Sequence, residues 1–158
     1  MPTNFERMIR LAEEFFETKN DPAQISVTEQ VMDHLHKLHP ATLSEFDDGN
    51  GPVVWILLIP TTMPLMERFI ANEISEKKLL DLTPLVGPYE SIYLCSALVL
   101  PEYRGKGLAK RIASGAIRSI TKDHPISSLF YWAFSREGAG LAESLAKETG
   151  LPLLMRPE

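Results

Sequence analysis

The sequence predicts a mixed α/β fold in a single domain spanning 1–158, with a central twisted sheet that carries helices on both faces. Three observations lead to this prediction. The 158 residues, 44% of them hydrophobic, are enough for one domain with its own core. Late in the chain, apolar strand-like runs alternate with helical patterns, as they do in crossover units. Earlier, DDGNG at 47–51 stands between two apolar runs and signals an antiparallel hairpin, so the sheet is expected to be mixed.

The first part of the chain predicts two helices followed by the two strands of the hairpin. Apolar residues at helical spacing indicate a helix over 4–18, and a second amphipathic stripe indicates a helix that Pro40 closes. The strands are expected at 42–46 and 53–59. Pro60 is expected to end the second strand.

The rest of the chain predicts further helices and strands in alternation. Residues 64–82 are interpreted as one or two helices, with Pro64 near a start and Ser75 as a cap. A β-rich run at 90–100 predicts a strand that Pro101 stops. The remaining elements are expected as helix, strand, helix and strand at 106–121, 127–134, 137–149 and 151–155.

The overall charge and the longest apolar run weigh against two classes of partner. A net charge of −5 disfavours nucleic acid and anionic membranes, both of which attract basic surfaces. The run VVWILLI is far too short to span a bilayer, and the acidic N-terminus does not resemble a secretory signal. Cys95 is the only cysteine, so no intrachain disulfide is possible and a cytoplasmic location is expected.

The histidines of HLHKLH do not have the spacing of a metal site. Metal ligands on a helix favour i and i+4 positions, whereas His34, His36 and His39 are two and three residues apart. No metal is therefore expected.

The stretch RGKGLA follows a predicted strand and opens a predicted helix. The first turn of a helix leaves backbone N–H groups without partners at the positive end of the helix dipole. Gly105 and Gly107 let an anion approach these groups, and Arg104 and Lys106 add positive charge, so the turn suits a phosphate-bearing ligand. A glycine turn that binds nothing is the common alternative. The sequence contains no P-loop, and Lys110 breaks the dinucleotide fingerprint.

A longer pattern around this turn suggests a family. V-x-P-x-x-R-G-x-G-x-A is filled by Val99, Pro101, Arg104, Gly105, Gly107 and Ala109. This pattern is similar to the acyl-CoA motif of the GNAT superfamily of N-acyltransferases, and the order strand, helix, strand, helix over 90–151 matches that family as well. The resemblance implies a GNAT-like sheet that is splayed between strands 90–100 and 127–134.

The resemblance also implies acetyl-CoA as the co-substrate. Backbone N–H groups of the turn would hold its pyrophosphate, and the end of the preceding strand would pair with the pantetheine arm. The residues implied in cofactor binding are Leu98, Val99, Leu100, Arg104, Gly105, Lys106, Gly107, Leu108, Ala109 and Ser135.

The catalytic groups are less well matched to the family. The family often places a glutamate base near the start of the motif strand, where this chain has Glu90; the alternative is that Glu90 is a solvated strand end. The family's tyrosine acid corresponds to Ala146, so the acid is missing or is Ser144, Ser135 or water. Residues 61–89 exceed the family's tight connection and are expected to border the acceptor site or a subunit contact.

The expected function is N-acetyl transfer from acetyl-CoA to an amine of a small molecule or a peptide. The alternative is a GNAT-like module that binds CoA or acyl-CoA without transfer, as a sensor or a partner-regulated protein. A third interpretation is an unrelated α/β protein with a glycine-lined turn, which would lack the splay. The acceptor, the acyl chain length and the oligomeric state, including a homodimer, are left open.

Overall fold

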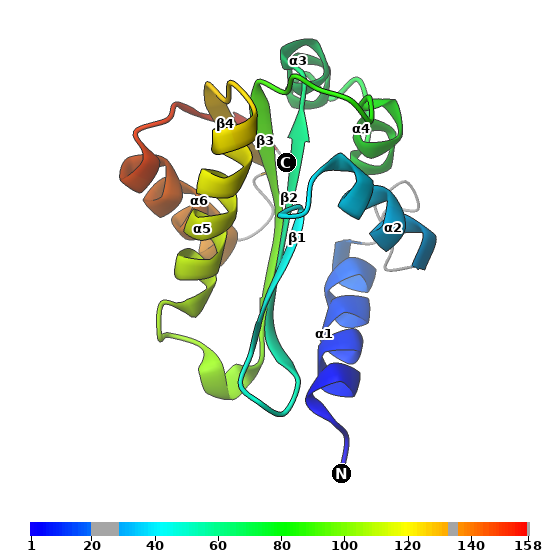
Figure 1. Ribbon diagram of the computed structural model, residues 1–158, viewed down its shortest axis with the longest axis vertical. Helices are drawn as coiled ribbons and strands as arrows, with labels where there is room; N and C mark the ends of the chain where they lie inside the picture. Colours follow the sequence, from blue (N-terminus) through cyan, green and yellow to red (C-terminus); the bar gives the residue numbers. More distant parts are fainter. Residues whose placement is uncertain (20–28, 133–135, 158) are drawn as a thin grey trace.

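Residues 1–19, 29–132 and 136–157 are described in the computed structural model of the chain (Figure 1). Within them, one five-stranded sheet comprises β1 (Leu43–Asp47), β2 (Pro52–Thr61), β3 (Ser91–Val99), β4 (Ser128–Trp132) and β5 (Leu153–Arg156). The strands lie in chain order. β2 pairs antiparallel with β1 and β3, whereas β4 pairs in parallel with β3 and β5, so the sheet is mixed.

Helices cover both faces of this sheet. They are α1 (Asn4–Lys19), α2 (Glu29–Leu38), α3 (Met63–Ile70), α4 (Glu76–Leu82), α5 (Leu108–Asp123) and α6 (Arg136–Thr149). In Figure 1, α5 and α6 lie on one side of the sheet, and α1 and α2 lie on the other. The predicted mixed α/β architecture is confirmed. Among the described residues, no helix is both long enough and apolar enough to cross a lipid bilayer.

The strand β2 lies at the centre of the core. All of its residues are buried, because α1 packs on one face of the sheet and α5 packs on the other. Met8 and Ala12 of α1, and Ala113 and Ile117 of α5, are almost fully buried. A strand that is covered on both faces is expected to be apolar throughout, which explains the run VVWILLI.

The prediction that Pro60 ends the second strand is wrong. β2 continues to Thr61, and Pro60 stands opposite Ile92 of β3. β1 reaches only to Leu43, which pairs with Leu57, so at Pro60 the strand has a neighbour on one side only. Proline is tolerated at such an edge because the ladder on that side needs no N–H from it. The other predicted boundaries shift by only one or two residues.

The segment between β2 and β3 contains helices, as predicted for residues 64–82. Pro64 lies in the first turn of α3. The Ser75 hydroxyl caps α4 by accepting the N–H of Lys78 at 3.1 Å. The two helices therefore begin where the sequence places their start signals.

Arg156 of β5 fixes this segment against the sheet. Its guanidinium donates to the Ile74 carbonyl at 3.3 Å and to the Asn72 side chain. It also lies over the rings of Phe69 and Trp132, 4.5 and 4.8 Å from their centres. Arg156 is only 9% exposed, so a buried charge holds the connection between α3 and α4 beside the carboxyl ends of β4 and β5.

Candidate functional site

β3 and β4 are neighbours over only part of their length. They pair as far as Tyr93 and Phe130, after which β3 continues to Val99 paired with β2. A cavity of about 830 Å³ lies where this pairing ends. Its lining includes β3 from Tyr93 to Val99 and Trp132 of β4, so the gap between the two strands belongs to the cavity.

A β-bulge lies in β3 at this point. Leu94 pairs with Leu58 and Ser96 pairs with Leu57, which leaves Cys95 as the extra residue. A bulge bends its strand and increases the local twist, which accounts for β3 turning away from β4. Because β4 no longer pairs with β3 after Tyr93, backbone donors and acceptors on the β4-facing edge of β3 are available to a ligand.

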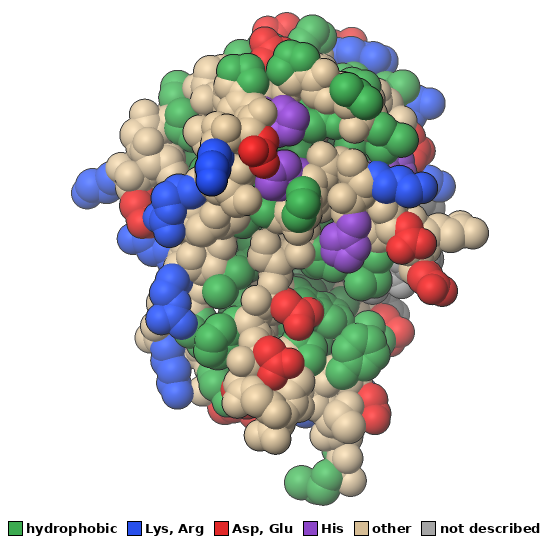
Figure 2. Space-filling model, in the orientation of Figure 1, with side chains coloured by type: hydrophobic (Ala, Val, Ile, Leu, Met, Phe, Trp, Pro, Cys, Tyr) green, Lys and Arg blue, Asp and Glu red, His purple; other side chains and the backbone are tan. Residues whose placement is uncertain are grey.

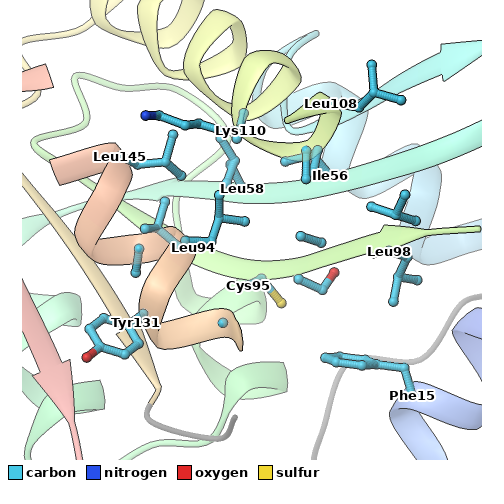
Figure 3. Close-up of a pocket in the computed structure, with 18 of the residues that line it drawn as sticks. Phe15, Ile56, Leu58, Leu94, Cys95, Leu98, Leu108, Lys110, Tyr131 and Leu145 are labelled. Atoms are coloured by element: carbon cyan, nitrogen blue, oxygen red, sulfur yellow. The ribbon is translucent and has the colours of Figure 1, made fainter. Parts of the chain in front are cut away.

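The cavity reaches both faces of the sheet (Figure 3). On one face α1 contributes Glu14 and Phe15, and on the other α5 and α6 contribute mostly apolar side chains. Figure 3 shows Phe15 and Leu108 on opposite sides of β3. The described lining is largely apolar, and its charged side chains are Glu14, Arg104 and Lys110.

The glycine turn forms the α5 end of the cavity. Gly105 and Gly107 have φ angles of 76° and 75°, a conformation that favours glycine. Gly107 is the N-cap of α5, and no described side chain caps the helix. A Cβ on either glycine would meet no atom within 4 Å, so glycine is favoured here by the positive φ and not by crowding, and the space beside it is open. The first-turn N–H groups of α5 therefore border open volume.

Most of the residues implied in cofactor binding do line the cavity: Leu98, Val99, Arg104, Gly105, Gly107, Leu108 and Ala109. Leu100 is buried in the core, and its N–H donates to the Val53 carbonyl at 3.0 Å. Lys106 is not a lining residue, and its ammonium lies 5.4 Å from the centre of the Tyr103 ring. Ser135 lies outside the described residues.

Contacts from α1 and from the β1–β2 hairpin brace the chain just before the glycine turn. Arg7 of α1 donates twice to Glu102, at 2.7 Å each, and this contact lowers the pKa of Glu102 to about 2. The Tyr103 hydroxyl donates to Asp48 at 2.5 Å, which raises the pKa of Tyr103 and lowers that of Asp48. The turn is thus positioned by elements distant in sequence.

Positive charge gathers along α5 although the whole chain is acidic. The exposed cations of this helix are Lys110, Arg111, Arg118 and Lys122, and Asp123 is its single acid. Figure 2 shows Lys and Arg side chains along the side of the molecule that α5 forms. Lys110 and Arg111 lie in the first turn, where they add to the helix dipole in attracting an anion.

The residues predicted for catalysis are not brought to the cavity. The Glu90 carboxylate accepts the N–H of Met63 at 3.3 Å, at the start of α3, and Glu90 is not among the lining residues. Its role as the base stays a prediction. Ala146 packs against the core, and Ser144 does not line the cavity either.

Sequence reasoning misses a buried carboxylate behind the cavity wall. Glu76, in the first turn of α4, is 2% exposed. It accepts the Tyr93 hydroxyl at 2.6 Å and the Cys95 thiol at 3.5 Å. Burial, and then the charge of Glu76, raise the pKa of Tyr93 well above its usual value, so this hydroxyl stays protonated. In the sequence Glu76 belongs to SEKK, which has the composition of a solvated helix face.

Of the three histidines, His39 makes contacts that connect two helices. The Nε2 of His39 lies 2.7 Å from an Asp123 carboxylate oxygen, and its Nδ1 accepts the N–H of Ala41 at 3.0 Å. His39 therefore links the end of α2 to the end of α5. Within the described residues, three or more metal-ligating side chains do not gather at one place.

Comparison with known proteins assigns no family. No family model matches the chain, and no curated protein sequence matches it significantly.

Proposed function

We propose that this protein is a GNAT-like N-acetyltransferase, which transfers an acetyl group from acetyl-CoA to an amine of a small molecule or a peptide. One observation carries the proposal. A single cavity joins the open, glycine-lined start of α5 to the gap between β3 and β4 at the bulge. A polyphosphate suits the first feature, and an extended arm ending in a thioester suits the second.

The α5 end of the cavity is suited to the pyrophosphate. Backbone N–H groups from Gly105 to Ala109 would approach it without a side chain in the way, and Arg104 and Lys110 would supply charge at the rim. The Arg104 Nε already donates to the Val99 carbonyl at 3.0 Å, which fixes the base of its side chain near the end of β3.

The edge of β3 that faces away from β2 is suited to the pantetheine arm. β4 no longer pairs with this edge after Tyr93, so the amides of an extended arm can take the place of a strand along Leu98 and Val99. This arrangement would bring the thioester toward the bulge at Cys95.

At the bulge the transfer is a direct one. The amine nitrogen attacks the thioester carbonyl carbon, a C–N bond forms, and the C–S bond breaks to release the thiolate of CoA. A backbone N–H on the edge of β3 that faces away from β2 would stabilise the oxyanion. The ammonium must lose a proton before it attacks, and the thiolate is a good leaving group that needs little help.

A second candidate function is binding of CoA or acyl-CoA without transfer. It is favoured by one observation: Glu90, Ala146 and Ser144 all lie outside the cavity lining. A GNAT-like sensor or partner-regulated module would need the cofactor turn but no base. Release of CoA from acetyl-CoA over a broad panel of primary amines separates the two candidates.

The first experiment measures binding itself. Calorimetry with acetyl-CoA should give heat with one site per chain, and bound acetyl-CoA should slow the reaction of Cys95 with iodoacetamide because the arm would cover the bulge. Cys95 is the only thiol in the chain, so the mass of the intact protein reports this reaction. Absence of heat at millimolar acetyl-CoA, with no protection of Cys95, would overturn the proposal.

A further inference from the structure

The side of α5 that faces away from the sheet carries a stripe of cations. Ala113 and Ile117 turn toward the core and are almost fully buried. Because an α-helix advances by about 100° per residue, Arg111, Arg118 and Lys122 lie on the opposite side of the helix, within an arc of about 40°. All three are exposed, and Figure 2 shows Lys and Arg side chains along this side of the molecule. These three residues form the outer stripe of α5.

Within the described part of the chain, the cations of the outer stripe have no carboxylate partner. Arg118 donates to the Ser114 hydroxyl at 3.1 Å, and the Arg111 guanidinium lies 5.7 Å from the centre of the Phe46 ring. Neither contact neutralises a charge. The Lys122 ammonium forms no ion pair with a described residue. The outer stripe therefore presents positive charges that a partner can reach.

Such unpaired cations are unexpected in an acidic chain. The sequence has 21 acidic and 16 basic residues, for a net charge of −5. α5 has four cations and one carboxylate, a formal charge of +3, so the rest of the chain carries −8. On the α6 side of the same helix, Lys110 does find a carboxylate, that of Glu148, at 3.8 Å. Like charges one helical turn apart, such as Arg118 and Lys122, repel each other, and an anionic partner would offset that repulsion.

Gly115 lies on the same side of α5, between Arg111 and Arg118. Glycine inside a helix is less stable than alanine, so its presence calls for a physical reason. A Cβ on Gly115 would meet only a guanidinium nitrogen of Arg118, at 4.0 Å, and the φ of Gly115 is not in the left-handed region. Neither crowding by described residues nor the backbone conformation therefore requires glycine here. The missing side chain leaves the backbone of α5 open to close approach from outside.

We propose that the outer stripe and Gly115 form a docking surface for an acidic segment of a partner protein. Carboxylates of that segment would pair with the three cations, which span about 16 Å along the helix axis, and its backbone would lie against Gly115. A protein segment fits this surface better than a nucleic acid or an anionic membrane. Both of those extend past three cations and would meet the −8 carried by the rest of the chain. None of the four residues lines the cavity, so the inference does not depend on acetyl-CoA.

The test uses a synthetic peptide as the partner. A fluorescein-labelled, alanine-based helical peptide with one glutamate per turn is titrated with the full chain, and fluorescence anisotropy reports binding. The same peptide with glutamine in place of glutamate is the charge control and should not bind. The acidic peptide should bind at low ionic strength. It should bind more weakly as salt is added, because exposed charges are screened beyond about 10 Å at about 0.1 M ionic strength.

Removal of the outer stripe should weaken this binding. Each exposed ion pair contributes a factor of about 1.4 to 5 in affinity. The triple variant Arg111→Gln/Arg118→Gln/Lys122→Gln loses three such pairs and should bind the acidic peptide about tenfold more weakly than the wild type.

A matched triple variant shows whether position or net charge decides the affinity. Arg10→Gln/Lys77→Gln/Lys78→Gln makes the same change in net charge at exposed positions on α1 and α4. Because these positions lie outside α5, the variant should change the affinity for the acidic peptide by less than about twofold.

Gly115→Gln tests the close approach of the partner backbone. Glutamine is a good helix former, so this variant should melt no lower than the wild type. Its side chain would fill the gap between Arg111 and Arg118 and hold the peptide away from both. The affinity should therefore fall by about the factor that one exposed ion pair contributes, about 1.4 to 5. Weaker binding without a lower Tm excludes misfolding as the cause.

Absence of acidic-peptide binding at low ionic strength would overturn the inference, as would equal weakening by the two triple variants or an affinity unchanged in Gly115→Gln. A single-stranded oligonucleotide or a phosphatidylserine vesicle that binds more tightly than the peptide would also overturn it, by assigning the outer stripe to nucleic acid or membrane. So would dimerisation, measured by sedimentation, that only the outer-stripe variant abolishes, because a second copy would then cover this surface.

Discussion

Replacing Gly107 by alanine should abolish acetyl-CoA binding at a modest cost in stability. The residue has a φ of 75° and caps α5. An L-residue in this left-handed conformation costs about 1–2 kcal/mol. In a domain of this size, about 1 kcal/mol corresponds to roughly 2–4 °C in Tm, so the free variant should melt about 2–8 °C lower than the wild type.

The effect on binding should be much larger than this strain. A ligand present at a hundredfold excess over its Kd stabilises the folded state by about 2.7 kcal/mol, which corresponds to a rise of roughly 5–11 °C in Tm. In Gly107→Ala the new methyl group would occupy the open volume in front of the first-turn N–H groups of α5 and hold the pyrophosphate away from them. The acetyl-CoA shift should then fall below about 2 °C.

Gly150 provides a matched control for backbone strain. It has a φ of 74°, and a Cβ there would also meet no atom within 4 Å, but it lies at the end of α6, outside the cavity lining. Gly150→Ala should lose similar stability and keep the full acetyl-CoA shift. Lys106→Ala should also keep it, since an exposed charge contributes about 1 kcal/mol or less. If Gly107→Ala and Gly150→Ala respond alike to acetyl-CoA, the pyrophosphate is not held by this turn.

Three further outcomes are expected. The pKa of Glu102 is about 2 in the folded protein, below its ordinary value of 4.5, because Arg7 donates to it. The contribution of Glu102 to stability is therefore present above pH 4.5 and lost as the pH falls toward 2. Thermal melting of Arg7→Ala between about pH 2 and 5 should lack this part of the acid dependence. Arg156→Ala should lower the free energy of unfolding by about 3 kcal/mol, because it leaves buried partners unsatisfied. The control Arg10→Ala, at an exposed site, should change that free energy by less than about 0.5 kcal/mol. Urea denaturation measures both values. Glu90→Gln should lower the free energy of unfolding by up to about 1 kcal/mol, because it removes a charge near a helix N-terminus. It should leave the pH–rate profile of CoA release unchanged. A shifted profile would show that Glu90 is the base.

The sequence predicts the parts of this molecule that depend on local interactions. The hairpin, the start of α4 at Ser75 and the glycine turn before α5 each involve residues only a few positions apart, so their physical causes can be identified in a short stretch of sequence. The continuation of β2 through Pro60 could not be predicted in this way. It depends on where β1 ends, which pairing between strands decides.

In the candidate site too, the parts that depend on neighbouring residues could be predicted and the parts that depend on distant residues could not. The residues that line the α5 end follow one another along the chain, and most of them were predicted. The wall at the other end joins Glu76 to Tyr93 and Cys95, which lie 17 and 19 residues away. No periodicity or motif links them, because the contact requires α4 to fold back over β3 and the bulge to set the direction of the Cys95 side chain.

The longer connection between β2 and β3 acquires a physical role from these contacts. Without α4 there would be no carboxylate behind Cys95, and without Arg156 the end of α3 and the start of α4 would lose the cation that ties them to β5. The same connection lowers the exposure of Glu76 to 2%, so its hydrogen bonds to Tyr93 and Cys95 are made out of contact with solvent. The connection between β2 and β3 therefore supports the part of the cavity wall that Tyr93 and Cys95 form.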